Sequence, residues 1–278
     1  MNKYSYQRVS VIVTTKNEED VIGTLLKSIK KQTYPSIETL IVDNHSSDNT
    51  IKIAKKYEVK CFTFGPERSA QRNFGAKKSR GKYLLFLDAD MELNPRVVES
   101  CVEVAKKGNF NGVAIPEQSV ALNFWGRVKA FERSFYNEKG DPITDAARFF
   151  AKNVFVKVGG YDETITGPED WDLPDTIREK GYRIGRSQEK IYHHEQEISL
   201  TDLFKKKFYY GLHAHQYLVK HKIALVSPRT IYFLRPLFYK NWTKLIYHPL
   251  LSLAMTYMLF VETLGGGLGY ILGRLRKK

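Results

Sequence analysis

The segment Lys82–Met91 reads KYLLFLDADM and combines an expected strand with a candidate ligand site. Its apolar residues Tyr83–Leu87 follow Gly81 and end in two carboxylates, Asp88 and Asp90. A short continuous apolar run of this kind is typical of a strand buried in a parallel sheet. Because ligands bind just beyond the carboxyl ends of such strands, we expect Asp88 and Asp90 to lie at a ligand site.

The two carboxylates also predict a bound cation. Carboxylates beside a hydrophobic core are unfavourable unless a cation or hydrogen bonds hold them ionised. A ligand set made of oxygens alone favours Mg or Mn, which would keep water ligands and bind a substrate phosphate as well. The alternative is a strand that merely ends in an Asx turn.

Strand-like and helix-like segments alternate around this strand. The expected strands are Val9–Thr14, Thr39–Val42, Lys60–Phe64 and Tyr83–Leu87, and the expected helices are Asn17–Lys31, one beginning at Ile51, Arg68–Ser79 and Arg96–Lys106. In the first helix, apolar residues share one face and lysines lie at the end, which suits the helix dipole. This order predicts an α/β fold with a mostly parallel sheet flanked by helices on both faces.

Composition limits the classes of partner. The 278 residues include 44 Lys and Arg against 30 Asp and Glu, a formal net charge of +14, which points to nucleic acid, anionic lipid or a phosphorylated substrate. Cys61 and Cys101 make no disulfide framework and suggest a reducing compartment or simple core filling. The first residues lack the apolar segment of a signal peptide, so we expect none.

The composition changes after Leu200, so we expect a domain over residues 1–200 and a basic, aromatic helical extension over residues 201–278. The extension contains an apolar run, Pro249–Val261, and a tail with Arg274, Arg276, Lys277 and Lys278. The run is shorter than the roughly 20 apolar residues of a transmembrane helix, so we expect the extension to lie in a membrane interface. The alternative is a helical pair that packs on the sheet domain.

Five motifs, taken in order, resemble those of family 2 glycosyltransferases. They are SVIVTTKNEED (Ser10–Asp20), LIVDNHSSDNT (Leu40–Thr50), RSAQRNFGAKKSRGKYLLFLDAD (Arg68–Asp90), VGGYDE (Val158–Glu163) and GPEDWDL (Gly167–Leu173). The resemblance covers roughly residues 8–200. It implies a GT-A fold, a nucleotide-sugar donor, a divalent metal and inversion at the anomeric carbon.

For the metal, the resemblance implies that Asp88 and Asp90 hold the ion, that Asp90 touches it most directly and that Asp88 also reaches the ribose. A late histidine commonly supplies a third ligand, and His193 in the motif YHHE (Tyr192–Glu195) matches that position better than His194. The metal would neutralise the negative charge that develops on the departing diphosphate. A single histidine is otherwise more often a packed or surface group.

For the acceptor, the resemblance implies that the acidic pair Glu169 and Asp170 lies at the reacting hydroxyl, with Asp170 as the base. Inverting substitution needs a base opposite the leaving group to take the proton of that hydroxyl. Trp171 is expected to form a wall of the acceptor pocket. The alternatives are that the acids only cap the following helix and that Trp171 fills the core.

For the nucleotide, the resemblance implies contacts from three parts of the chain. Asp43 would hydrogen-bond the base, Arg72 and Asn73 would lie near the ribose and phosphate, and the loop around the nucleoside would contain Thr14, Thr15, Asn17 and Glu18. The first loop reads Thr14-Thr15-Lys16 where many relatives carry a Pro, and Asn44-His45 replaces a common Asp-Gly, so the base stays open. The Gln-x-x-Arg-Trp motif of processive relatives is absent, which indicates addition of one sugar per encounter.

These features predict an inverting glycosyltransferase, peripheral or monotopic, on the cytoplasmic face of a membrane. It would move a single sugar to a lipid-linked or otherwise membrane-associated acceptor, and the alternative within the class is a polyprenyl-phosphate glycosyltransferase. A sugar nucleotidyltransferase is disfavoured because Val9–Glu19 contains no Gly-rich loop with a basic residue. Nucleic-acid binding is disfavoured because the basic residues concentrate after Leu200, beside long apolar segments.

Overall fold

The computed structural model describes residues 6–138, 140–141, 145–194 and 197–275. The chain forms two units, each described below by itself. The sheet unit comprises Met1–Glu117, Ala146–Glu163 and Leu173–His194, and the helical unit comprises Gln118–Asp145, Thr164–Asp172 and Glu195–Lys278. Glu195 of the YHHE motif and Arg276, Lys277 and Lys278 of the basic tail lie outside the described residues. The predicted division at residue 200 stays a prediction about domain organisation.

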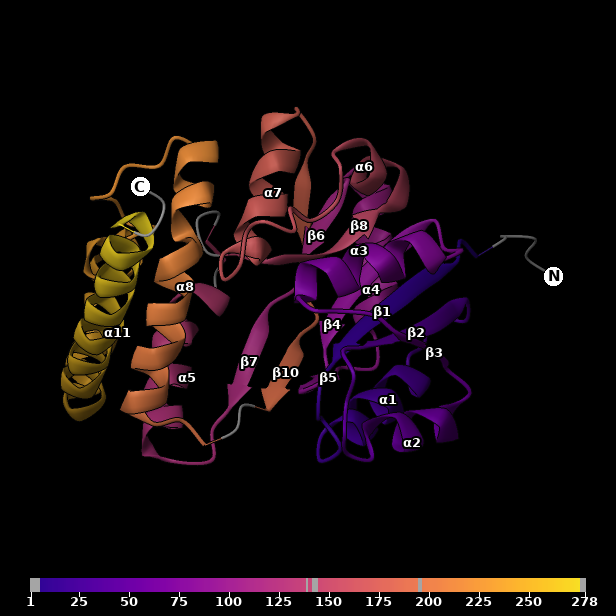
Figure 1. Ribbon diagram of the computed structural model, residues 1–278, viewed down its shortest axis with the longest axis horizontal. Helices are drawn as coiled ribbons and strands as arrows, with labels where there is room; N and C mark the ends of the chain where they lie inside the picture. The colour runs from indigo at the N-terminus through magenta and orange to yellow at the C-terminus, as the bar shows by residue number, and fades with distance from the viewer. Residues whose placement is uncertain (1–5, 139, 142–144, 195–196, 276–278) are drawn as a thin grey trace. The chain divides into compact units, whose positions relative to one another are not determined.

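A seven-stranded sheet with the order β3-β2-β1-β4-β8-β6-β9 forms the centre of the sheet unit (Figure 1). The strands are β1 (Val9–Thr15), β2 (Ile37–Asp43), β3 (Lys60–Thr63), β4 (Tyr83–Asp88), β6 (Gly112–Ala114), β8 (Ala147–Ala151) and β9 (Ile184–Arg186). The first four strands pair parallel with one another, β8 is antiparallel to both β4 and β6, and β6 is parallel to β9. The predicted α/β fold with a mostly parallel sheet is confirmed.

Helices cover both faces of this sheet, because alternate residues of a strand point to opposite sides. The helices are α1 (Ile22–Lys30), α2 (Thr50–Ala54), η1 (Lys55–Tyr57), α3 (Arg68–Lys78), α4 (Val97–Lys107), α6 (Lys152–Lys157) and, from Leu173 onward, α7 (Glu169–Glu179). Val11 and Leu85 belong to a core with Leu25 of α1, whereas Leu84 and Phe86 belong to a second core with α3, α6 and α7. The buried strands are therefore apolar on both faces, as a continuous apolar run requires.

The first helix begins later than predicted. The sequence pattern suggested Asn17–Lys31, but α1 begins at Ile22 because Asn17 has a φ of 56°, a left-handed conformation that Asn tolerates and a helix excludes. Asn17 instead joins two loops: its N–H donates to Ser46 Oγ (2.8 Å), and its Oδ1 accepts from the N–H of Ser47 (2.9 Å).

The register of the sheet brings the ends of three strands level. Thr15 of β1 lies opposite Asp43 of β2, and Thr14 lies opposite Asp88 of β4. Just beyond, β5 (Met91–Leu93) pairs antiparallel with β10 (Ile191–His194) and places His193 opposite Met91. The segments around residues 14, 43, 88 and 193 therefore meet at one end of the sheet.

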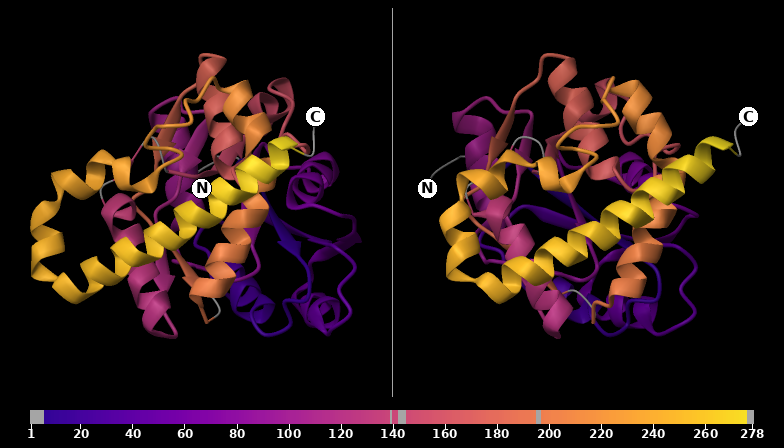
Figure 2. Two further views of the ribbon diagram at one scale, coloured as in Figure 1. Left: turned by 60° about the vertical axis from the view of Figure 1, so that its left-hand side comes forward. Right: turned by 90° about the vertical axis from the view of Figure 1, so that its left-hand side faces the viewer.

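The helical unit is built from α5 (Phe124–Asn137), α8 (Leu200–Lys220), η2 (Tyr232–Leu234), α9 (Pro236–Lys240), α10 (Trp242–Tyr247) and α11 (Pro249–Leu275), and β7 (Glu117–Val120) leads into it. The yellow helix α11 crosses the orange helix α8 in both views of Figure 2. A Cβ added at Gly265, Gly269 or Gly273 of α11 would collide with backbone carbonyl oxygens of α8. Glycines four residues apart therefore allow the two helices to approach closely.

Buried ion pairs join α11 to α5 and α8. Lys129 Nζ lies 3.0 Å from Glu262 Oε1 and 3.0 Å from Glu132 Oε2. Arg235 Nη1 lies 3.3 Å from Glu132 Oε1, and Lys207 Nζ lies 4.0 Å from Glu262 Oε1. Burial would raise the pKa of Glu262, but the charges of Lys129 and Lys207 outweigh burial and lower that pKa to about 2.

Within the described residues, α11 is the one helix long and apolar enough to cross a membrane by length and composition alone, a criterion that a soluble core helix also meets. One face packs inside the unit, where Met258, Leu259 and Glu262 are buried. The other face exposes apolar side chains spaced three or four residues apart, namely Leu250, Leu253, Tyr257, Phe260, Leu264, Leu268, Ile271 and Leu275.

Candidate active site

Asp88 lies at the end of β4 in a strongly cationic setting. Its Oδ1 is 3.0 Å from Arg72 Nη2, its Oδ2 is 3.3 Å from Arg148 Nη1, and Thr14 Oγ1 donates to Oδ1 at 3.4 Å. Burial would raise the pKa of Asp88, but Arg72 and then Arg148 outweigh it and hold that pKa far below its usual value. Asp88 is therefore an anion, and both of its oxygens are engaged by cationic side chains.

Asp90 forms a different cluster with His193 and Glu117. Its Oδ2 lies 3.0 Å from His193 Nε2, and His193 Nδ1 lies 3.4 Å from Glu117 Oε2. Asp90 Oδ1 is buried and has no hydrogen-bond partner among the described residues. A buried carboxylate oxygen without a donor is unfavourable, so this oxygen has the properties of an unfilled cation ligand.

The predicted metal can be tested against this cluster. Among the residues that the structure describes, there is no group of three or more His, Cys, Asp and Glu side chains arranged to hold a metal ion. Asp90 and His193 nonetheless supply one carboxylate and one imidazole nitrogen, and Asp90 Oδ1 needs a positive partner. These two residues fit an ion such as Mn, which accepts both ligand types. The other histidine of the motif, His194, instead pairs with Glu92 at 2.8 Å.

Asp43 stabilises the loop after β2. Its Oδ1 accepts from Thr15 Oγ1 (2.9 Å) and from Ser46 Oγ (2.5 Å), and its Oδ2 accepts from the N–H of Ser46 (2.9 Å). Gln71 of α3 donates to the carbonyl oxygens of Thr15 (3.2 Å) and Val42 (2.7 Å) and so joins the first two strand ends. The predicted nucleotide residues Thr14, Thr15 and Asp43 thus lie together, while their contact with a nucleotide stays a prediction.

Glu18, in the loop after β1, lies close enough to the acidic residues of the site for their negative charges to raise its pKa. Its pKa rises to about 7, chiefly because burial disfavours the charged carboxylate and further because Asp90, Asp88 and Asp48 repel it. A cation bound near Asp90 would oppose this repulsion. Glu18 therefore reports on the negative potential that a metal would neutralise.

Arg72 and Asn73 are neighbours on α3, but their side chains contact different residues. Arg72 is fully buried, binds Asp88 and lies 5.0 Å from the ring centre of Tyr161. Asn73 Nδ2 donates to the carbonyl of Tyr161 (2.8 Å) and to Glu163 Oε1 (2.8 Å), and Asn73 Oδ1 accepts from the N–H of Tyr161 (2.9 Å). The Asn73 side chain therefore holds the VGGYDE turn in place, and its predicted role near the ribose stays a prediction.

The acidic turn Gly167–Asp172 belongs to the helical unit. Gly167 has a φ of +104°, and a Cβ there would lie 2.7 Å from the Tyr210 ring, so glycine is required. Glu169 is buried and its Oε2 accepts from the N–H of Gly167 at 2.5 Å. Asp172 is 1% exposed and lies 2.8 Å from His221 Nε2.

Asp170 and Trp171 are half-buried, as are Gly167 and Pro168 of the same turn. Glu169 and Asp172 both hold the turn through the contacts given above. Trp171 lines a cavity of the helical unit and also packs, partly buried, against the core cluster of Ile165, Tyr217 and Leu218. The roles of Asp170 as base and Trp171 as acceptor wall stay predictions.

Sequence reasoning missed two residues of the site, Arg148 and Glu117. Arg148 is buried and bridges Glu117 Oε1 (2.6 Å) and Asp88 Oδ2 (3.3 Å). Its one signal in the sequence is a charged residue within the apolar strand ARFFA, Ala147–Ala151. Glu117 carries no local signal, because its contacts with Arg148 and His193 depend on the chain path.

Comparisons with known proteins bear on the family and the fold of this chain. The family model described as glycosyl transferase family 2 matches residues 10–160. The O-antigen biosynthesis protein RfbC of Myxococcus xanthus is 27% identical over 236 residues, which cover 73% of this chain and 18% of that protein. The chain spans from 18% to 47% of the length of the first three curated relatives that it matches.

Solved structures share the fold. The mannosyltransferase PcManGT of Pyrobaculum calidifontis, solved with GDP-Man and Mn2+, is 19% identical with a TM-score of 0.61, covering 94% of this chain and 74% of its own. S. aureus TarS 1–349, solved with UDP-GlcNAc, is 19% identical with a TM-score of 0.59, covering 95% of this chain and 89% of its own. The predicted GT-A fold is confirmed.

Proposed function

This chain belongs to glycosyl transferase family 2, and from that premise we propose that it transfers one sugar, with inversion, from a nucleoside-diphosphate sugar to a membrane-associated acceptor. The observation that carries the proposal is the pair of Asp90 and His193, 3.0 Å apart at the end of β4, with Asp90 Oδ1 buried and without a partner among the described residues. Such a pair suits a divalent ion beside a diphosphate.

The donor site is proposed for the sheet unit. Asp90 and His193 would hold Mg or Mn, which supplies positive charge to the diphosphate when bound. Asp88, held by Arg72 and Arg148, would accept hydrogen bonds from the ribose, and Thr14, Thr15, Asn17, Glu18, Asp43 and Asn73 would surround the nucleoside. The donors named for the two structural neighbours, GDP-Man and UDP-GlcNAc, support a nucleotide sugar and leave its base open.

The acceptor chemistry is assigned to the acidic turn. Asp170 would take the proton of the acceptor hydroxyl as the glycosidic bond forms, while Glu169 holds the turn through the N–H of Gly167. Trp171 would line the acceptor site, because it already borders a cavity. If the acceptor is instead a polyprenyl phosphate, its oxygen is already anionic and little base catalysis is needed.

The proposed place of action is the cytoplasmic face of a membrane, with peripheral or monotopic attachment. The exposed apolar face of α11 supports attachment, since it runs from Leu250 to Leu275 at helical spacing. The buried Glu262, paired with Lys129, favours a helix that lies on the membrane over one that crosses it. The name of RfbC, an O-antigen biosynthesis protein, supports a role in glycan biosynthesis.

The test is release of nucleoside diphosphate from nucleotide sugars in the presence of Mn²⁺. The full chain is incubated with UDP-, GDP- and dTDP-sugars, with and without chelator, and Asp90→Asn is compared with Glu92→Gln. Glu92 is a matched control because it also pairs with a histidine, His194, but stands outside the proposed site. We expect metal-dependent release that Asp90→Asn abolishes and Glu92→Gln retains; no release from any donor, or full activity in excess chelator, contradicts the proposal.

A further inference from the structure

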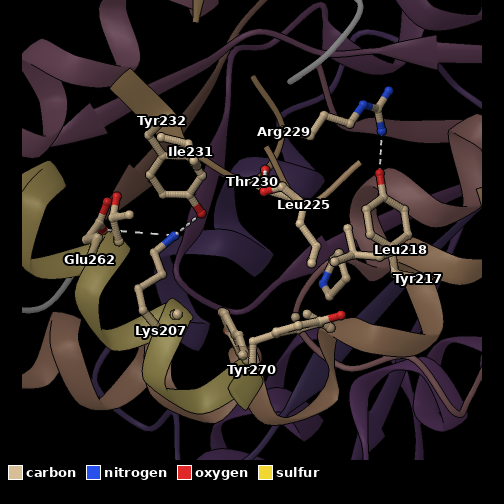
Figure 3. A pocket seen from close by; sticks show the side chains of 18 of the residues that line it. Lys207, Tyr217, Leu218, Leu225, Arg229, Thr230, Ile231, Tyr232, Glu262 and Tyr270 are labelled. Atoms are coloured by element: carbon tan, nitrogen blue, oxygen red, sulfur yellow. Dashed lines mark hydrogen bonds and ion pairs between the residues drawn. The ribbon is translucent and has the colours of Figure 1, made fainter. Parts of the chain in front are cut away.

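The helical unit contains a cavity of about 520 Å³ (Figure 3). Its walls come from α8, from α11, from the segment of residues 225–232 and from the acidic turn at Gly167–Trp171. All of these lie within one unit. The volume falls inside the range of about 300–1,000 Å³ that is typical of small-molecule sites.

Two glycines of α11, the half-buried Gly266 and the exposed Gly267, lie at the wall and rim of this cavity. A Cβ at Gly266 would have its nearest neighbour 3.9 Å away, and one at Gly267 would meet nothing within 4 Å, yet both residues line the cavity. They differ from Gly265, Gly269 and Gly273, where a Cβ would collide with α8. Glycine is unfavourable inside a helix, so its presence where helix packing does not require it indicates that the empty space is useful.

The lining is largely apolar and aromatic. It includes Trp171, Tyr210, Tyr217, Leu218, Tyr270 and Ile271. Leu225 and Ile271 also border the cavity although they are 52% and 57% exposed, so its opening is apolar. Ile271 belongs at the same time to the exposed apolar face of α11, which therefore leads from the surface into the cavity.

One end of the cavity is cationic. In Figure 3 the amine of Lys207 points toward the hydroxyl of Tyr232, to which it donates at 2.8 Å, and toward Glu262 at 4.0 Å. Lys207 belongs to a buried set in which three cations, Lys129, Lys207 and Arg235, accompany two carboxylates, Glu132 and Glu262. This set carries one more positive than negative charge, and a bound anion would balance it.

A second cation borders the same cavity. Arg229 donates a hydrogen bond to the hydroxyl of Tyr217, and both residues belong to the lining. Together, the apolar walls and opening exclude a purely polar ligand, and Lys207 and Arg229 disfavour a neutral one. The chemistry that satisfies both conditions is an amphiphile with a hydrocarbon chain and a phosphate head.

We propose that this cavity binds the chain of a single-chain phosphate amphiphile, with the phosphate at its cationic lining. A single chain fits better than a two-chain phospholipid because the cavity has a volume of only about 520 Å³. Trp171 lines the cavity and directly follows Asp170 in the chain, so the cavity borders the turn that carries the proposed base. The identification of this ligand as the lipid anchor of the acceptor rests on the proposed function, but binding itself does not.

The test measures binding of farnesyl phosphate to the full chain by calorimetry, with farnesol and inorganic phosphate as partial ligands. Gly267→Phe would place a ring at the exposed rim of the cavity, Gly267→Ala would change helix propensity with little added volume, and Leu268→Phe would add a ring on the exposed apolar face of the same helix. We expect Gly267→Phe to weaken binding at least tenfold, the other two variants to bind like the original chain, and farnesol to bind more weakly than farnesyl phosphate.

Three results would overturn the proposal. They are unchanged binding by Gly267→Phe, equal binding of farnesol, or displacement of farnesyl phosphate by two-chain phosphatidylglycerol vesicles at matched lipid concentration. Should Gly267→Phe fail to fold by circular dichroism, photolabelling of the unaltered chain with a diazirine farnesyl phosphate replaces it. Labels within Tyr210–Leu218 and Gly266–Ile271 support the cavity, and labels confined to other segments contradict it.

The outcome is separable from that of the proposed function. Release of nucleoside diphosphate is measured on the same preparations without any lipid. If the original chain does not bind farnesyl phosphate but releases nucleotide normally, the cavity assignment alone is rejected. Binding without any nucleotide release rejects the glycosyltransferase proposal and leaves the cavity as an amphiphile site.

Discussion

His193 Nε2 lies 3.0 Å from Asp90 Oδ2, although the two residues are 103 positions apart in the chain. The antiparallel pairing of β5 with β10 produces this contact, because it places His193 opposite Met91. The consequence is a carboxylate and an imidazole at the end of a buried strand, and this geometry underlies the first prediction.

Replacing Asp90 by Asn should remove metal binding while the chain stays folded. The substitution keeps the shape of the side chain and eliminates the charge of Asp90, so the affinity for Mn²⁺ should fall by more than about tenfold. The affinity is measured from the rise of the melting temperature as Mn²⁺ is added. An Asp90→Asn protein that Mn²⁺ still stabilises like the original chain would assign the metal to other residues.

Replacing Asp170 by Asn should slow transfer to a hydroxyl acceptor by about 10²-fold or more, because the variant cannot accept a proton. Affinity for the donor should hardly change, since the proposed donor residues lie in the sheet unit. The measurements are kcat for transfer and Kd for the nucleotide sugar. A small effect on kcat would instead favour a phosphate acceptor, as in the polyprenyl-phosphate alternative.

Replacing Glu18 by Gln should stabilise the protein at pH 8 but not at pH 4. The pKa of Glu18 rises from 4.5 to about 7 on folding, so the ionised carboxylate destabilises the native state. This penalty is absent below about pH 4.5, grows as the pH rises toward 7 and is complete above it. Melting temperatures of Glu18→Gln and of the control Glu103→Gln, compared across pH, measure the effect. An equal gain at both pH values would show that Glu18 acts through packing.

Replacing Glu262 by Gln should destabilise the helical unit by about 3 kcal/mol or more, because it leaves Lys129 and Lys207 buried with less negative charge. The matched control is Glu138→Gln, which removes an exposed pair with Lys244 and should cost less than about 1 kcal/mol. Chemical denaturation measures both.

The lowered pKa of Glu262 also predicts that the stability of the helical unit falls at acidic pH. Because the pKa of Glu262 is lowered to about 2, its stabilising contribution is complete above the ordinary value of 4.5 and is lost as the pH falls from there toward 2. The difference in stability between the original chain and Glu262→Gln should therefore shrink over that interval. A difference that is constant with pH would contradict the assignment.

Introducing charge on the outer face of α11 should release the protein from membranes. Leu253 and Phe260 are exposed there, whereas deletion of the whole helix would also remove buried residues such as Met258. The double variant Leu253→Glu/Phe260→Glu should no longer float with anionic liposomes, and Leu122→Glu, at an exposed leucine outside α11, should float normally. Original chain that stays at the bottom of the gradient in low salt would refute membrane attachment.

Local pattern was sufficient to predict most of the sheet unit. The apolar runs at Val9–Thr14 and Tyr83–Leu87 became β1 and β4 nearly residue for residue, because a strand buried on both faces tolerates few polar side chains. The start of α1 was wrong by five residues, since the left-handed backbone at Asn17 has no reliable signature in a run of polar residues. The antiparallel direction of β8 could not be predicted either, because strand direction depends on the path of the chain and not on the sequence of the strand itself.

The sequence alone therefore identified which acids end which strands, namely Asp43, Asp88 and Asp90, since strand ends follow from local periodicity. Only the tertiary structure decided what each acid does. It placed Arg72 and Arg148 against Asp88, and it left Asp90 Oδ1 buried beside His193. The physical reason is that the state of a buried carboxylate depends on burial and on charges within a few ångströms, and folding brings those charges from distant parts of the chain.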